Sequence, residues 1–537
     1  MITTTITSSL REALEDVGIS SLPNIIDIEQ PANRDHGDWS SNIALVVAKN
    51  SGWTPRDLAE EIAKRINAAL PEHVEHVGVA GPGFINFELM PSWLHKTLRE
   101  VLHEGTNCFG KPNIGQGQKV NIEFVSANPT GPLHAGHARG ACYGDSIANI
   151  LEAIGYSVER EFYMNDRGLQ MRLFAESLLA RKAGEEVPEG GYGGAYIQEW
   201  AKVMPDGLSQ QEAQEWGCDY SKKDQRQTLE QLGIVFDTWF SEHSMVESGA
   251  IEQTIDDLDQ RQISYDEGGA KWLKSTDYDD DKDRVLIKSD GELTYLTPDI
   301  AYHRDKFSRS EWLINVWGAD HHGYIARMKA AMSALGHDPD LLTITITQLV
   351  RLVRGGEEVR LSKRSGDIIE LRDIVQEIGA DATRFMYLLQ SADTKQTFDL
   401  DLAASKVMEN PVFYVQMAHA RLCSIQNKVE TLNLQPVLDE DVDLSLLVHE
   451  RELELLRSLY SFADVVQLSA RELAPHKIAV WLRELANATH GFYHDCYVVG
   501  DGVSPELTQA RLQLVEATRI GLVSGLSLLG VSAPNTM

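Results

Sequence analysis

Cysteine is scarce in this 537-residue sequence, and long apolar runs are absent. The five cysteines lie far apart, with no C-x-x-C pair and no H-E-x-x-H motif, so neither a disulfide framework nor a structural zinc site is expected. No run of about 18 apolar residues is present to span a bilayer, and the first residues lack the basic and apolar segments of a secretory signal. We therefore expect a cytoplasmic protein that has no membrane contact and no metal site built from clustered side chains.

Basic residues are also few relative to acidic residues. Lys and Arg number 49 against 80 Asp and Glu, and the net charge of -31 argues against a nucleic-acid partner, whose phosphates would be repelled. The distribution is uneven, however: residues 151–300 contain 15 basic and 32 acidic side chains, whereas residues 101–150 contain three of each. The acidic excess is concentrated in the middle of the chain, so the net charge does not exclude local contacts with RNA.

The length predicts three or four domains, at roughly 100 to 200 residues per domain. Residues 1–112 mix helical patterns with short apolar runs, which is typical of a compact α+β domain. In residues 374–537 apolar side chains recur at intervals of three and four, which predicts an all-α bundle.

The central region, residues 113–373, begins with the order strand, loop, helix, strand, which is the opening of a parallel α/β sheet. The first strand is expected at 119–124 and the helix from about 137 to 155. A long, acidic and mostly helical insertion is expected at about 165–290. Later strands of the same sheet are expected at 155–164, 312–320 and 342–352.

The loop after the first strand contains the string EFVSANPTGPLHAGHARG, in which His134 and His137 stand among glycines where a helix begins. Exposed N–H groups and the positive end of the helix dipole favour an anion there. An imidazole can donate a hydrogen bond to a phosphate, so the pattern suits a triphosphate. The alternative is that both histidines are ordinary capping or packing residues.

A second motif, GGEEVRLSKRSGD at 355–367, places Lys363 and Arg364 between Gly356 and Gly366. A lysine on such a loop can neutralise the charge that develops on a departing pyrophosphate. The alternative for this motif, taken alone, is a solvated surface turn.

In order and separation the two motifs resemble the signature motifs of class I aminoacyl-tRNA synthetases, with HAGH as the first and RLSKR as the second. The longer string FVSANPTGPLHAGHARG is similar to that of the arginyl-tRNA synthetases. The resemblance extends along essentially the whole chain through the strings DHGDWSSNIA, GPGFINF, FYMNDRGLQM, YLTPDIAYH, GADHHGYIARMKAA and NPVFYVQMAHARL.

The resemblance implies a multidomain α/β protein. It would have an N-terminal α+β domain that contacts tRNA, a Rossmann-like parallel-sheet catalytic domain with a helical insertion, and a C-terminal α-helical anticodon-binding domain. It implies that ATP and L-arginine form arginyl-adenylate, with Mg²⁺ accompanying ATP, and that the arginyl group passes to the terminal adenosine 2′-OH of arginine tRNA. The family also implies a monomer whose activation step requires bound tRNA.

The same resemblance implies roles for individual residues. ATP binding and catalysis fall to His134, Gly136, His137, Arg360 and Lys363, with Lys363 stabilising the transition state at the α-phosphate. Some family members have a lysine just before the first motif where this chain has Gly131, while Arg360 replaces the usual first lysine of the second motif.

The arginine substrate carries a planar guanidinium, which requires fixed carboxylates. The resemblance assigns its pocket and the contacts to its α-amino and carboxylate end to Glu123, Ser126, Asn128, Tyr295, Asp299 and Asp320. The alternative for each acid, without the motifs, is a surface charge or helix cap.

Base stacking and phosphate contact are expected from aromatic and basic side chains outside the sheet. Trp39 is the candidate in the N-terminal domain, with a buried tryptophan as the alternative. In the helical domain the candidates are Tyr414 and Arg421, together with Trp481, Tyr493 and Tyr497, several of which are alternatively core residues.

Two other functions compete with this interpretation. One is an adenylate-forming nucleotidyltransferase that does not use tRNA, although such enzymes lack a helical C-terminal third. The other is a catalytically inactive RNA-binding paralogue, against which the intact His134, His137 and Lys363 argue.

Overall fold

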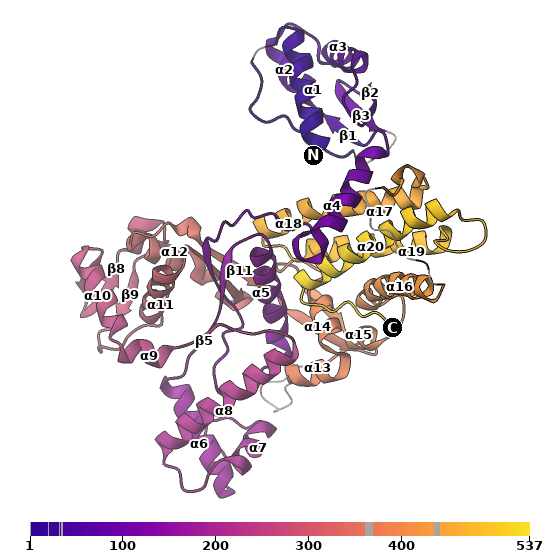
Figure 1. The fold of residues 1–537 in the computed structure, drawn as a ribbon. Helices are drawn as coiled ribbons and strands as arrows, with labels where there is room; N and C mark the ends of the chain where they lie inside the picture. Colours follow the sequence, from indigo (N-terminus) through magenta and orange to yellow (C-terminus); the bar gives the residue numbers. More distant parts are fainter. Residues whose placement is uncertain are drawn as a thin grey trace. The chain divides into compact units, whose positions relative to one another are not determined.

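A five-stranded parallel sheet is the centre of the computed structural model, which describes residues 2–537 except 20, 32, 34, 35, 360–368, 433 and 435–440 (Figure 1). The strand order is β11-β10-β4-β5-β6, and every neighbouring pair is parallel. The strands are β4 (Lys119–Glu123), β5 (Ser157–Met164), β6 (Thr238–Ser241), β10 (Trp312–Gly318) and β11 (Leu342–Thr347). The chain leaves β4 toward β5 on one side and returns to β10 on the other, so a topological switch point lies at β4, where open α/β sheets bind ligands.

The central strand β4 and its neighbour β10 have buried apolar side chains, as expected for parallel strands covered by helices on both faces. Val120 and Ile122 of β4 and Leu313 and Ile314 of β10 are fully buried. Polar side chains nevertheless alternate with them. The register places Glu123 between Glu161 of β5 and Asn315 of β10, and all three are buried.

Helices flank this sheet at its switch point. The helices are α5 (Ala135–Ala153), α11 (Leu296–Arg309) and α12 (Ile325–Ala334). Leu296 and Ile300 of α11 pack with Leu313 of β10 and Met328 of α12 in one apolar core. Tyr295 is the N-cap residue of α11 without a side-chain capping hydrogen bond, and Pro298 is the third residue of the helix.

The segment expected as an insertion is mostly helical, but it also supplies strands. Its β6 completes the edge of the parallel sheet, and a separate antiparallel sheet of order β7-β8-β9 follows. Its further elements are α6 (Gly168–Ala183), α7 (Ala195–Val203), α8 (Gln210–Gln231), α9 (Glu242–Glu247), α10 (Ala250–Gln260), β7 (Ser264–Glu267), β8 (Ala270–Leu273) and β9 (Arg284–Ile287).

The prediction of one strand over 342–352 is wrong. β11 ends at Thr347, and the chain then forms β12 (Val350–Arg354), which belongs to another sheet of order β13-β12-β14. The other strands of that sheet are β13 (Glu357–Glu358) and β14 (Gln396–Asp399). The apolar pattern does not distinguish two short strands with a bend from one longer strand.

The N-terminal part is α+β, as predicted. Its antiparallel sheet has the order β1-β3-β2. Thr54 caps α3 by accepting from the Asp57 N–H, and Pro55 takes the first helical position. The elements are α1 (Ile2–Asp16), β1 (Trp39–Ser41), α2 (Ile43–Val47), α3 (Pro55–Ala68), β2 (Val74–Ala80), β3 (Phe84–Leu89) and α4 (Ser92–Cys108).

The C-terminal third is almost wholly helical. Its helices are α13 (Leu371–Ile378), α14 (Ala380–Tyr387), α15 (Leu400–Ala404), α16 (Pro411–Thr431), α17 (Glu450–Tyr460), α18 (Phe462–Arg471), α19 (His476–Asp495) and α20 (Pro505–Leu528). Two units divide the chain: one is Met1–Gly105 with Ile425–Tyr460 and Gly491–Thr518, and the other is the remainder, which contains the parallel sheet. Within the described ranges, every helix is too short or too polar to cross a bilayer.

Candidate active site

The loop between β4 and α5 leaves the sheet through a strained turn. Val125 and Ser126 have φ values of 68° and 43°, in the left-handed region that favours glycine. The Ser126 side chain holds this turn: its hydroxyl donates to Glu123 Oε1 at 2.9 Å and accepts from the Tyr163 N–H at 3.2 Å. The turn therefore fixes the Glu123 carboxylate at the carboxyl edge of the sheet.

The two histidines of the first motif form the N-terminus of α5. His134 is the N-cap, with its Nδ1 accepting from the Gly136 N–H at 3.1 Å, and His137 Nδ1 accepts from the His134 N–H at 3.1 Å. The rings lie 3.9 Å apart between centroids. Because each Nδ1 is an acceptor, each ring carries its proton on Nε2 when neutral. A Cβ on Gly136 would meet the His134 ring at 2.8 Å, so this close approach requires glycine.

The second motif falls partly outside the described residues, which end at 359 and resume at 369, so the positions of Arg360 and Lys363 are not described. The chain that follows this segment is bonded to the first motif: Ala135 N–H donates to the Ile369 carbonyl at 3.1 Å, and Leu371 N–H donates to the Leu133 carbonyl at 2.8 Å. Ile369 and Leu371 therefore lie next to the N-terminus of α5.

Acidic side chains converge at the same edge of the sheet. Asp299, in the first turn of α11, accepts from the Tyr324 hydroxyl at 2.7 Å. Glu242, at the start of α9 and directly after β6, is buried and accepts from the Tyr163 hydroxyl at 2.9 Å. After burial, the charges of Glu242, Asp299 and Glu123 all raise the pKa of Tyr163, so the three carboxylates act on the same tyrosine.

Among the described residues, no basic side chain forms an ion pair with Asp299. Burial, together with the charges of Glu123 and Glu242 and against the hydrogen bond from Tyr324, raises the pKa of Asp299 to about 7. Burial also raises the pKa of Glu242, although Tyr163 and Arg167 oppose the shift. A site that holds carboxylates at this energetic cost is prepared for a cationic ligand.

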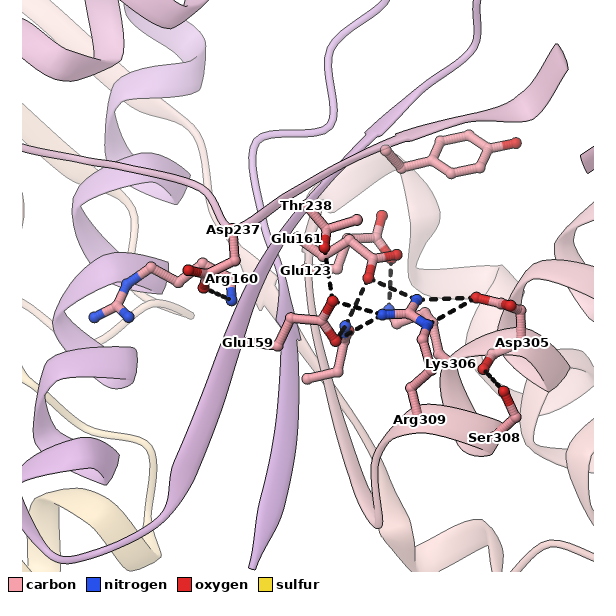
Figure 2. Close-up of polar contacts among 12 residues, drawn as sticks. Glu123, Glu159, Arg160, Glu161, Asp237, Thr238, Asp305, Lys306, Ser308 and Arg309 are labelled. Carbon is pink, nitrogen blue, oxygen red and sulfur yellow. Dashed lines mark hydrogen bonds and ion pairs between the residues drawn. The ribbon is translucent and has the colours of Figure 1, made fainter. Parts of the chain in front are cut away.

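Glu123 has a closer cation than Glu242, whose carboxylate lies 3.8 Å from Arg167. Lys306 of α11 is fully buried and donates to Glu123 Oε2 at 2.9 Å. Burial alone would raise the pKa of Glu123, but the Lys306 charge and the hydrogen bonds from Lys306 and Ser126 lower it. Figure 2 shows Lys306 and Arg309 reaching from the same helix toward acids of the sheet, Arg309 toward Glu159 and Glu161 at 2.6 and 2.7 Å.

Three other predicted arginine-binding residues lie at the surface of the same edge. Asn128 is exposed and donates to the Gln170 side chain at 2.6 Å. Tyr295 is 83% exposed immediately before α11. Asp320 follows β10 in the short 3-10 segment Ala319–Tyr324, with its exposed carboxylate 3.5 Å from His321. The structure thus groups Glu123, Ser126 and Asp299 and leaves these three facing solvent.

Comparison with known proteins identifies the family. Three family models match: "Arginyl tRNA synthetase N terminal domain" over 4–89, "tRNA synthetases class I (R), catalytic domain" over 97–189 and 205–427, and "DALR anticodon binding domain" over 415–537. The arginine–tRNA ligase of Bacillus subtilis (strain 168) is 43% identical over 535 residues, which cover 96% of this chain and 95% of that protein. The chain belongs to the arginyl-tRNA synthetase family. Arginine–tRNA ligase 1 of Halalkalibacterium halodurans is 44% identical, with the same coverage.

Solved structures of arginyl-tRNA synthetases have the same fold. A crystal structure assigned to this family from Campylobacter jejuni is 35% identical, with a TM-score of 0.76, and covers 84% of this chain and 100% of that chain. The Thermus thermophilus arginyl-tRNA synthetase is 24% identical, with a TM-score of 0.77 and full coverage of both chains, and supports the fold alone. The predicted fold class is confirmed: an α/β synthetase with an N-terminal α+β domain and a C-terminal helical domain.

Sequence reasoning missed Glu242, Lys306, Tyr163 and Tyr324 in this synthetase. Glu242 directly follows β6, whose four residues lie inside the expected insertion. Had TWFS been assigned to the parallel sheet, the rule that ligands bind at the carboxyl ends of such strands would have pointed to Glu242. The pattern contains no comparable signal for Lys306, because the carboxylate that it binds, Glu123, is 183 residues away in sequence.

The predicted RNA-contacting residues have varied surroundings. Trp39 is buried and packs edge-on against Tyr460 with centroids 6.2 Å apart, which matches the alternative of a buried tryptophan. The Tyr414 hydroxyl donates to Asn487 at 3.2 Å, and Arg421 lies 2.8 Å from His490 Nδ1. Of the further aromatics, Trp481 is buried, whereas Tyr493 and Tyr497 are exposed. Their contacts with RNA stay predictions.

Proposed function

We propose that the edge of the sheet formed by β4, β6, α5 and α11 binds arginine and ATP side by side for adenylate formation. The chain is an arginine–tRNA ligase, and the proposal concerns which residues perform its chemistry. The observation that supports it is that the β4–α5 loop runs from the buried Glu123 carboxylate to the N-terminus of α5 at His134.

The acidic pocket is the proposed guanidinium site. Asp299 and Glu242 carry negative charge on partly or fully buried carboxylates, and a planar guanidinium satisfies two such groups with several charge-assisted hydrogen bonds. Lysine, with one point charge, satisfies them less well. Glu123 and Ser126, with Asn128, Tyr295 and Asp320 at the rim, are proposed to hold the rest of the substrate.

The N-terminus of α5 is the proposed triphosphate site. His134 and His137 carry Nε2–H donors in the positive field of the helix, beside Gly136, whose own N–H is bonded to His134 Nδ1. Arg360 and Lys363 are proposed to add positive charge as pyrophosphate departs. Mg²⁺ is proposed to arrive with ATP and to be held largely through its phosphates; the absence of a structural zinc site stays a prediction.

The reaction needs no nucleophile from the protein. The arginine carboxylate attacks the α-phosphate, pyrophosphate leaves, and the terminal ribose 2′-OH of arginine tRNA then takes the arginyl group. Positioning and charge stabilisation supply most of the catalysis. We propose that bound tRNA is required for activation, that the helical domain binds the anticodon region, and that the enzyme is a cytoplasmic monomer.

Pyrophosphate exchange with each amino acid, with and without arginine tRNA, tests the activity. We expect exchange with arginine only, and only when tRNA is present. Exchange with another acid in the absence of RNA would support the nucleotidyltransferase alternative. RNA binding without any exchange would indicate an inactive paralogue.

Replacement of Glu242 by Gln is expected to raise the KM for arginine about 10- to 100-fold, because hydrogen bonds to charged groups contribute about 1.5–3 kcal/mol. The value of kcat should change little, since Glu242 is expected to contact the guanidinium equally in the ground state and in the transition state. Steady-state exchange kinetics measure both constants. Glu247→Gln on the same helix is the control: Glu247 is exposed and pairs with His243 at 3.3 Å. A normal KM in Glu242→Gln would remove Glu242 from the pocket.

Arginine affinity is expected to depend on pH through Asp299. Its pKa is raised to about 7, first by burial, so the carboxyl is protonated below that pH, whereas the guanidinium favours the carboxylate. The apparent KM for arginine should therefore rise about tenfold between pH 8 and pH 6, as expected for one proton lost on binding. The Asp299→Asn variant should lose this dependence, and an equal dependence in both proteins would contradict the assignment.

A further inference from the structure

Lys306 begins a chain of buried hydrogen bonds that connects two of the proposed arginine-binding residues. Its ammonium donates to Glu123 Oε2 at 2.9 Å and to Asn315 Oδ1 at 2.7 Å. Asn315 Nδ2 lies 2.6 Å from His303 Nε2, and His303 Nδ1 lies 2.8 Å from the Asp299 carbonyl oxygen. These contacts span β4, β10 and α11, and Lys306, Asn315 and His303 are at most 3% exposed.

The chemistry of lysine determines the direction of every bond in this chain. An ammonium only donates, so Asn315 must turn its oxygen to Lys306 and its NH₂ to His303. His303 Nε2 must then accept, which places the ring proton on Nδ1, where it is donated to the Asp299 carbonyl. Burial, with the nearby Lys306 charge, lowers the pKa of His303 to about 4, so the ring is neutral.

The Lys306 ammonium also lies 4.9 Å from the centroid of the Tyr302 ring. Protein groups therefore stabilise its buried positive charge without solvent. Lys306 therefore acts on both ends of the pocket at once. It keeps Glu123 ionised at the end of β4, and through Asn315 and His303 it fixes the first turn of α11, from which the Asp299 carboxylate projects.

We propose that Lys306 is a positioning residue for arginine, which sets the spacing and orientation of Glu123 and Asp299 through the Asn315 and His303 side chains. This inference rests on the proposed arginine pocket. Lys306 itself needs no contact with substrate, because its donors are directed to Glu123 and Asn315 and its charge faces the Tyr302 ring.

The test compares arginine kinetics of Lys306→Met and Asn315→Asp in the full chain with tRNA. Both variants should raise the KM for arginine about tenfold or more while kcat changes less than about threefold, since the pocket is misaligned and the ATP site is not. Asn315→Asp retains a partner for Lys306 and leaves Glu123 paired, but its carboxylate cannot donate to His303. If Lys306→Met fails to fold because Glu123 is left buried without its cation, Asn315→Asp alone decides the question.

A spectroscopic readout separates positioning from loss of structure. In the wild type, ¹⁵N shifts of the His303 ring should show the proton on Nδ1, with the signal assigned by its loss in His303→Gln. In Asn315→Asp the proton should appear on Nε2, because an aspartate at this place accepts. A signal that stays on Nδ1 would overturn the proposed direction of the chain.

Arg309→Met is the matched control, one turn further along α11. Arg309 is bonded to Glu159, Glu161 and Asp305, and in the described part of the chain it is not hydrogen-bonded to Glu123, Asn315 or Asp299. This variant should therefore lower thermal stability without raising the arginine KM. An equal rise in the arginine KM of the control would indicate a general loosening of the structure and overturn the proposal.

If Asp299→Asn raises the arginine KM while Lys306→Met and Asn315→Asp do not, only the positioning role of Lys306 is refuted. A normal KM in Asp299→Asn would instead refute the pocket.

Discussion

Replacing Lys363 by Ala is expected to lower kcat for arginine activation about 100- to 1000-fold, the range observed when one preorganised stabilising group is removed. The KM values for arginine and ATP should stay within about threefold of the wild type, because the ammonium acts on charge that develops only as pyrophosphate leaves. Single-turnover and exchange kinetics in the presence of tRNA measure this separation.

The structure supports this expectation from the chain that flanks Lys363. Ile369, six residues after Lys363, accepts from the Ala135 N–H, and Leu371 donates to the Leu133 carbonyl, so these two residues lie at the proposed triphosphate site. Lys288→Ala is the control, since Lys288 is a surface lysine paired with Glu292 at 2.8 Å. An unchanged kcat in Lys363→Ala would remove the residue from the mechanism, and a matching rise in the ATP KM would assign it to ground-state binding.

Local patterns were sufficient to predict the core of the site. The strand at 119–124 and the helix near 137–155 correspond to β4 and α5, because a buried apolar run followed by a Gly- and Pro-rich loop and a helical period determines those elements locally. Glu123 and the two histidines were therefore placed correctly at a strand end and a helix start.

Residues that depend on long-range pairing were not predictable in the same way. β6 has four residues, and only its bonds to β5 make it part of the sheet, so Glu242 was not recognised. In the sequence, Lys306 is one of several charged residues in a helix of mixed polarity. Its role depends on Glu123, which is 183 residues earlier in the chain. Tertiary context decides such positions, which is why composition and period do not reveal them.

The acidic middle of the chain is also better understood from the structure. Glu161 is fully buried and Glu242 and Asp224 are nearly so, and Arg309, Tyr163 and Arg372 respectively bond to them. Part of the charge excess in residues 151–300 therefore belongs to the interior and to the proposed arginine pocket. It does not describe the surface that RNA meets, so net charge was a poor guide to partners.

Substitution of Asp299 by Asn is expected to raise the KM for arginine about 100-fold, because it removes a charge-assisted contact with the guanidinium from a partly buried site. The fold should be retained: the amide oxygen of Asn can still accept from the Tyr324 hydroxyl, which donates to Asp299 at 2.7 Å. Loss of a carboxylate whose pKa is raised by burial also relieves repulsion with Glu123 and Glu242, so thermal stability should not fall.

Asp305→Asn is the matched control for this variant. Asp305 lies on the same helix, pairs with Arg309 at 2.9 Å and is 40% exposed, so its replacement should leave the arginine KM unchanged. Calorimetric titration with arginine in the presence of tRNA and an unreactive ATP analogue measures affinity without turnover. A normal arginine affinity in Asp299→Asn would show that the guanidinium is held elsewhere. In that case, weaker arginine binding by Glu242→Gln would indicate a pocket centred on α9. Normal binding by Glu242→Gln would indicate that the guanidinium does not bind at this edge of the sheet.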